Sequence, residues 1–175
     1  AQVESGNVTW DVVDMELADA LRACDEGLLE SIDHSALPAS PEGLPATEDF
    51  IDGALQECAV GNIVWSSVYA YDSSKIRNWN APKTMADFFN TTAYPGKRGM
   101  RKNAKVTLEF ALMGDGVPTD QVYDLLSTEE GLARAFAKLD TIKDDIIWWE
   151  AGAQPPQLLA DGEVVFSTAW NGRVF

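Results

Sequence analysis

Carboxylates and a single histidine are the groups in this chain that could carry out acid, base or nucleophilic chemistry. His34 is the one histidine, and no GxSxG segment occurs, so an activated serine nucleophile is not indicated. Asp14 and Glu16 follow a short apolar run, and open α/β sheets place ligand sites after their strands. These acids therefore either receive a cationic ligand or, as first-turn acids, interact with a helix dipole. No GxxxxGK or GxGxxG segment predicts a nucleotide site.

Basic and aromatic side chains are the other candidates for ligand binding. Five of the 13 basic residues lie within nine positions, namely Lys97, Arg98, Arg101, Lys102 and Lys105. This cluster holds a ligand carboxylate, pairs with acids of another chain, or forms a solvated face that balances nearby acids. Several tryptophans fall at or beside predicted strand ends, at positions 65, 148, 149 and 170. Such rings either pack in a core or cage an ammonium group, at about 0.5 to 2 kcal/mol per contact.

The composition limits the classes of partner. The 175 residues are 46% hydrophobic and 23% charged, as expected for a globular protein of one large or two small domains. The formal charge of −15 repels phosphate backbones, so nucleic acid is not an expected partner. No apolar run approaches the ~20 residues of a membrane span, and we expect no direct membrane insertion. The start, AQVESGNVTW, lacks signal-peptide features, so we expect any signal peptide to be already removed.

The cysteines and the single histidine are too few for a zinc or cluster site. The chain has two cysteines, Cys24 and Cys58, and no CxxC pair. We expect no metal and no cofactor. On the residues alone, the two cysteines form either a disulfide or two buried thiols.

The elements that must position these residues are strands and helices in alternation. Apolar runs predict strands over 10–15 and 61–72, and helical spacing predicts a helix over 17–28. Further along, we expect a short helix over 84–89, a strand near Met100, a helix over 105–113 capped by Asn103, and a helix opening at Thr128. A strand over 146–152, a helix over 155–162 and a strand over 163–170 follow. This order predicts an α/β protein with a mainly parallel sheet.

Taken in order, these segments resemble the periplasmic solute-binding proteins of ABC importers, and most of all their spermidine/putrescine-binding cluster. The most specific matches are YPGKRG, LLADGEV and AWNGR. The resemblance implies a type II periplasmic-binding-protein fold with two α/β lobes. The lobes close on a small cationic or zwitterionic, polyamine-like solute and deliver it to an inner-membrane ABC permease, without enzymatic chemistry. Family members are longer than this chain, so we expect one lobe to be incomplete.

The resemblance also divides the chain and assigns its compartment. Residues 1–65 are expected to form part of the first lobe, 66–168 a nearly complete second lobe, and 169–175 a crossing back to the first. The expected lobe crossings are strands over 63–69 and 166–172. A periplasmic location is oxidising, which predicts a disulfide between Cys24 and Cys58. An incomplete lobe leaves apolar surface exposed, which predicts self-association or a companion fragment.

The implied binding residues depart from the polyamine pattern. Trp170 matches a family aromatic residue that packs on the polyamine chain. Glu16 replaces a hydroxyl residue, whereas Asn103 and Val106 fall where polyamine binders carry acids. These changes favour an uncharged or zwitterionic solute, with Glu16 binding an amine and Arg101 or Lys102 a carboxylate. The residues expected to line the cleft are Glu16, Trp65, Ser66, Ser67, Asn103, Gln154, Trp170 and Asn171.

Two other functions compete with this interpretation. The same cleft would serve a sensory receptor that docks on a chemoreceptor or a kinase. An α/β enzyme would use Glu16 or Glu150 as a general base, but the sequence supplies no partner nucleophile for it.

Overall fold

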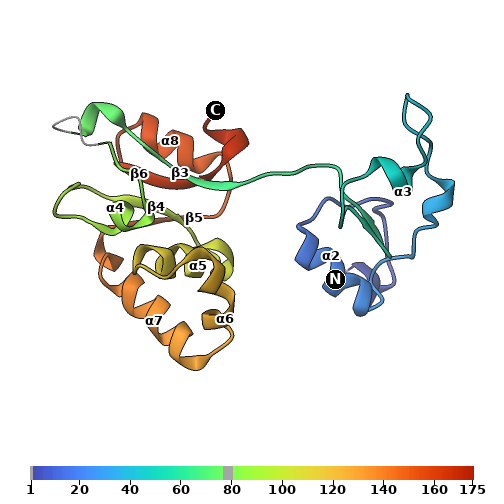
Figure 1. The fold of residues 1–175 in the computed structure, drawn as a ribbon, viewed down its shortest axis with the longest axis horizontal. Coiled ribbons are helices and arrows are strands. Elements are labelled where there is room, and N and C mark those ends of the chain that lie inside the picture. The colour runs from blue at the N-terminus through green and yellow to red at the C-terminus, as the bar shows by residue number, and fades with distance from the viewer. Residues whose placement is uncertain (1, 77–80) are drawn as a thin grey trace. The chain divides into compact units, whose positions relative to one another are not determined.

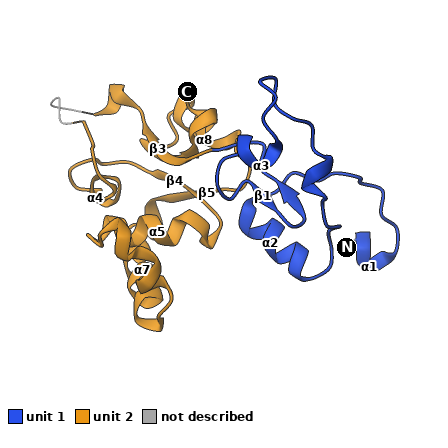
Figure 2. Cartoon of the chain, turned by 45° about the vertical axis from the view of Figure 1, so that its right-hand side comes forward, with its two compact units in different colours: residues 1–64 blue, residues 65–175 orange. Residues whose placement is uncertain are grey.

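The computed structural model describes residues 2–76 and 81–175. The chain divides into two compact units, residues 1–64 (unit 1) and 65–175 (unit 2), coloured separately in Figure 2. In neither described range does a helix combine the length and hydropathy that crossing a bilayer requires. The predicted third segment, 169–175, lies within unit 2, and its role as a crossing stays a prediction.

Unit 2 is built on a four-stranded sheet of order β3-β6-β4-β5. Its strands are β3 (Ser67–Tyr71), β4 (Arg98–Arg101), β5 (Ile146–Trp149) and β6 (Phe166–Trp170). β4 pairs in parallel with β5 and with β6, whereas β3 pairs antiparallel with β6. The mainly parallel α/β sheet predicted from the alternating elements is confirmed, with one antiparallel edge strand.

Helices cover both faces of this sheet. They are α4 (Met85–Phe89), α5 (Ala104–Gly114), α6 (Val122–Leu126), α7 (Glu129–Asp140) and α8 (Gln154–Ala160). Figure 1 shows α8 on one side of the sheet and the other four helices on the opposite side. Polar side chains begin them as expected: Asn103 accepts a hydrogen bond from the Lys105 amide, and Thr128 accepts one from the Gly131 amide.

The core of unit 2 is aromatic and lies between the sheet and its helices. Phe88, Met100, Leu112 and Phe166 are fully buried. The Phe166 ring lies 5.5 to 6.0 Å from the rings of Phe88, Tyr69, Tyr71 and Tyr94, in tilted or edge-on geometries that favour aromatic pairs. This tight packing fixes the positions of the strands and therefore of the residues at their ends.

Arg98 is part of this core rather than of a basic surface. Its side chain is fully buried, with the guanidinium 5.1 Å from the centroid of Phe166. Nε donates to the carbonyl oxygen of Phe88 at 2.9 Å and Nη2 to that of Tyr94 at 2.7 Å. Nη2 also donates to the carbonyl of Asn90, and Nη1 to that of Gly96. Burial lowers the pKa of Arg98, and Asp145 opposes this shift. The four carbonyls accept from four of the five guanidinium N–H groups.

Unit 1 has little core of its own. It contains α1 (Gln2–Ser5), α2 (Leu17–Asp25), α3 (Ala46–Asp49) and an antiparallel pair, β1 (Leu55–Gln56) and β2 (Ala59–Val60). Within its described residues, Ala20 and Ala46 are the buried apolar side chains. Many large apolar residues are exposed, including Trp10, Val12 and Ile63.

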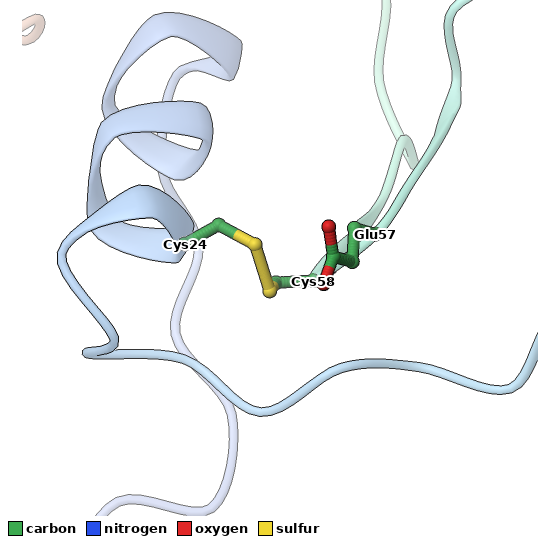
Figure 3. A group of neighbouring side chains, drawn as sticks. All are labelled: Cys24, Glu57 and Cys58. Atoms are coloured by element: carbon green, nitrogen blue, oxygen red, sulfur yellow. A yellow bond between two sulfur atoms is a disulfide. The ribbon is translucent and has the colours of Figure 1, made fainter.

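A disulfide ties α2 to the β1–β2 hairpin of unit 1. Cys24 and Cys58 are bonded, as predicted, and Figure 3 shows the bond beside Glu57. Cys24, Glu57 and Cys58 form the group of metal-type ligands found among the described residues, but the two sulfurs are bonded to each other rather than free as thiolates. The ring of His34 hydrogen-bonds the Gln56 carbonyl at 2.9 Å, which gives the histidine a structural partner.

One predicted strand is wrong, and a second is shorter than predicted. Residues 10–15, all described, form no strand, and β3 begins at Ser67 rather than at 61. Val12 is 89% exposed and Val64 79% exposed. An apolar, β-branched run becomes a strand only where a neighbouring strand pairs with its backbone groups in register, and among the described residues β3 pairs with β6 only over Ser67–Tyr71.

Candidate functional site

The parallel strands of unit 2 end together in polar and aromatic residues. β4 ends at Arg101, β5 at Trp149 and β6 at Trp170. β3 runs in the opposite direction with Ser67 opposite Trp170, so Trp65 and Ser66 enter at the same edge. Ligands of open α/β sheets bind outside the carboxyl ends of the strands. This edge is therefore the candidate site of unit 2.

Three tryptophans and one arginine meet at this edge. The Trp170 ring lies 5.9 Å from that of Trp65 and 5.8 Å from that of Trp149, both edge-on. The guanidinium carbon of Arg101 lies 5.1 Å from the centroid of the Trp170 ring. Stacking on an aromatic face holds a guanidinium in place while its N–H groups point outward in the ring plane. The cluster of Trp65, Trp149, Trp170 and Arg101 is called the strand-end cluster below.

Hydrogen bonds hold the segment that carries Trp65 against the end of β6. The Asn171 amide donates to the Ser66 carbonyl at 2.9 Å, and the Ser66 amide donates to Asn171 Oδ1 at 3.0 Å. These two residues, both predicted to bind ligand, thus position the Trp65–Trp170 pair in this structure. Their contact with a solute stays a prediction.

Two further predicted residues hold loops at the same edge. Gln154 Oε1 accepts hydrogen bonds from the amides of Glu150 and Ala151, at 2.8 and 2.7 Å, and so shapes the turn after β5. Asn103 Oδ1 accepts from the Lys105 amide and begins α5 after β4. Each side chain fixes the loop that follows a parallel strand.

A small cavity is lined in part by residues of the strand-end cluster. Its volume is about 10 Å³, close to the minimum that holds one water molecule. Its lining includes Ser67, Arg101, Val106, Trp149 and Trp170. Val106 has a φ of 71°, a left-handed conformation that is rare for a β-branched residue and costs on the order of 1 to 3 kcal/mol. Strained backbone of this kind concentrates at functional sites.

The remaining basic residues separate by environment. Lys97 is exposed, and Lys102 pairs with Glu150 at 3.6 Å, with both side chains largely exposed. Arg98 is the buried residue of the core described above. Among these basic residues, Arg101 lies in the candidate site, where it is half-buried beside Trp170.

Glu16 belongs to unit 1. It stands at the N-cap position of α2, where its side chain caps no helix amide, and it is half-buried. Its participation in the site of unit 2 stays a prediction.

Trp149 is the site residue that sequence reasoning missed. It is 2% exposed, and the sequence alone marks it only as one of several tryptophans near predicted strand ends. The signal that could have found it is its position as the last residue of a parallel strand, three residues before Gly152. Gly152 matters because a Cβ there would overlap the Trp170 ring.

Comparison with known proteins places the chain in a family. The family of bacterial extracellular solute-binding proteins matches residues 1–175. A gamma-aminobutyric acid-binding protein of Pseudomonas aeruginosa is 53% identical over 174 residues, which are 99% of this chain and 47% of the relative.

Two solved structures resemble the chain in fold and in sequence. The glucopine complex of the binding protein MotA from A. tumefaciens B6 is 38% identical with a TM-score of 0.87, covering 99% of this chain and 51% of MotA. The Atu4243-GABA receptor is 40% identical with a TM-score of 0.77, covering 98% of this chain and 49% of the receptor. The fold expected from the resemblance is confirmed, whereas a polyamine-like solute is not. The chain spans about half the length of these relatives, and it belongs to the family of bacterial extracellular solute-binding proteins.

Proposed function

We propose that this protein is the substrate-binding component of an ABC importer and that it captures a small zwitterionic amino acid of the GABA type. Arg101, held over Trp170 at the carboxyl end of β4, is the observation that carries the proposal. The protein would work in the periplasm and deliver its solute to an inner-membrane permease. The relatives named for GABA, 53% and 40% identical to this chain, support the class of solute.

The chemistry of the strand-end cluster suits a carboxylate attached to a short aliphatic chain. A guanidinium binds a carboxylate through two parallel hydrogen bonds and stays charged at any physiological pH. The ring of Trp65, which is 40% exposed and edge-on to Trp170, presents apolar surface on which methylene groups can pack. An amine at the far end of the solute requires an acid, and Glu16 remains our candidate for it.

A polyamine suits this part of the chain less well. Asn103 and Val106 carry no charge, and Arg101 would repel an ammonium group placed beside it. Lys102, next to Arg101 in sequence, pairs with Glu150, so its charge is balanced locally. The charge of Arg101 at the end of β4 therefore favours an anionic group of the solute, although the whole chain is acidic.

Substitution of Arg101 tests the proposal. In the full-length protein, Arg101→Gln should weaken GABA binding by about 100-fold or more in titration calorimetry, because the carboxylate loses its charged, bidentate partner. Arg101→Lys keeps the positive charge but loses the planar pair of N–H donors, so it should retain part of the affinity. Lys97→Gln, an exposed change in the same basic cluster, is the matched control and should leave binding unaltered. Equal GABA affinity in Arg101→Gln and Lys97→Gln would contradict the proposal.

A further inference from the structure

Trp149 carries a buried donor with nothing to bind. Its side chain is 2% exposed, and among the described residues its Nε1 is the buried side-chain nitrogen or oxygen that has no hydrogen-bond partner. Buried polar groups in native proteins are nearly always satisfied, so an unpaired one indicates a missing partner. The indole nitrogen is only a donor, so the partner must be an acceptor.

The surroundings of Trp149 narrow the chemistry of that acceptor. Trp149 lines the small cavity at the strand-end cluster together with Arg101, Thr107 and Thr168. Arg101 offers only donors. The hydroxyls of Thr107 and Thr168 donate to the backbone carbonyls of Arg101 at 2.9 Å and of Gly99 at 3.5 Å, and neither hydroxyl accepts a hydrogen bond from Trp149 Nε1. A cation and an unused N–H donor in one largely apolar cavity favour an anionic oxygen.

We propose that Trp149 is a specificity-determining residue whose indole N–H donates to one oxygen of the solute carboxylate that Arg101 binds. This inference rests on the proposed function and deepens it. A cavity of about 10 Å³ admits a group the size of one oxygen atom, so the carboxylate reaches Nε1 while the rest of the solute stays outside. The edge-on contact with the Trp170 ring, at 5.8 Å between centroids, fixes the orientation of the Trp149 ring.

Trp149→Phe removes the N–H group and keeps an aromatic ring at the same place. In the full-length protein it should weaken GABA binding by about 10- to 100-fold, the effect of losing a hydrogen bond to a charged group. Trp148→Phe is the matched control, since Trp148 is the adjacent residue and 44% exposed, and it should bind GABA within twofold of the wild type. Trp149→Phe also removes buried ring volume and should lower stability somewhat in either case, so affinity is the deciding measurement: a purely structural role predicts lost stability with unchanged affinity. That result would overturn the proposal.

An NMR titration of the wild type separates this inference from the proposed function. Butyrate, a plain carboxylate, and GABA are added in turn while the indole N–H resonance of Trp149 is followed. We expect both solutes to move this resonance downfield. If butyrate moves it and GABA does not bind, the proposed function is wrong and the role of Trp149 stands. If neither moves it, the donor serves a buried water or none at all, and the role of Trp149 is wrong. The titration uses no variant, so it decides the matter even if Trp149→Phe does not fold.

Discussion

Arg98 and Arg101 stand three residues apart on β4 in different environments. Arg98 is buried and donates to backbone carbonyls of the α4–β4 segment, whereas Arg101 is half-buried over Trp170. Arg98→Met should therefore lower the free energy of unfolding by about 3 kcal/mol or more, because several buried carbonyls lose their donors at once. Urea unfolding measures this, with Lys97→Met as the exposed control, expected within about 0.5 kcal/mol of the wild type. A loss no larger than that of the control would contradict the structural role of Arg98.

Gly152 provides a test of the Trp170 position at the same scale. A Cβ at Gly152 would overlap the Trp170 ring, whereas a Cβ at Gly172 meets no heavy atom within 4 Å. Gly152→Ala should displace Trp170 and weaken GABA binding by about tenfold or more, since a misplaced contact group loses much of its binding energy. Gly172→Ala should bind normally in the same calorimetric assay. Identical affinities in both variants would show that the Trp170 position does not matter for binding.

At the scale of elements, the disulfide holds unit 1 together where packing does not. It closes a loop with a sequence separation of 34 between α2 and the β1–β2 hairpin. For a loop of this length the chain-entropy treatment gives about 3 to 4 kcal/mol of stabilisation. The double variant Cys24→Ser/Cys58→Ser should show faster amide hydrogen exchange over residues 17–60. Exchange in the four-stranded sheet of unit 2 should be unchanged. Unaltered exchange over residues 17–60 would contradict this account.

The start of α4 carries a pH-sensitive cap. Asp87 accepts hydrogen bonds from the amides of Lys83 and Thr84, and the Thr84 side chain accepts one from the Asp87 amide. The hydrogen bond from the Lys83 amide lowers the pKa of Asp87 below its ordinary value. Desolvation of the Asp87 carboxylate raises this pKa, but by less. A carboxylate with a lowered folded pKa stabilises the protein above its unfolded pKa of about 4, and this contribution is lost as the pH falls through the folded pKa.

Asp87→Asn should therefore reduce stability at pH 7 and flatten its decline below about pH 4. Thermal unfolding between pH 2 and 7 measures both effects, with the exposed Asp120→Asn as a control. An unchanged acid slope in Asp87→Asn would contradict the assignment.

These elements also show what the sequence could predict. Caps and apolar spacing are local signals, so the helices that begin after Thr84, Asn103 and Thr128 were predicted close to where they lie. The strand over 10–15 was wrong because strand formation depends on a distant partner. In the candidate site, the resemblance singled out Trp170, which ends β6, and its contact with a solute stays a prediction. The difference between Arg98 and Arg101, and the buried donor of Trp149, depend on three-dimensional neighbours that no spacing rule contains.

At the scale of the whole molecule, unit 1 exposes several large apolar side chains. Val12, Trp10 and Ile63 are 89%, 66% and 67% exposed, and the chain spans about half the length of its relatives. Residues 1–175 produced alone should therefore self-associate, whereas residues 65–175, which contain the aromatic core, should remain monomeric. Sedimentation velocity compares the two. A monodisperse monomer of residues 1–175 would count against this prediction.

The central claim is that the strand-end cluster selects a carboxylate-bearing solute. A thermal-shift measurement on the full-length protein with GABA, other amino acids, putrescine and spermidine tests it most directly, because a ligand that binds only the native state raises the melting temperature. We expect GABA or a closely similar zwitterion to raise the melting temperature and the polyamines to leave it unchanged. A higher melting temperature with putrescine or spermidine, and an unchanged one with every zwitterion, would contradict the claim and indicate a polyamine as the solute.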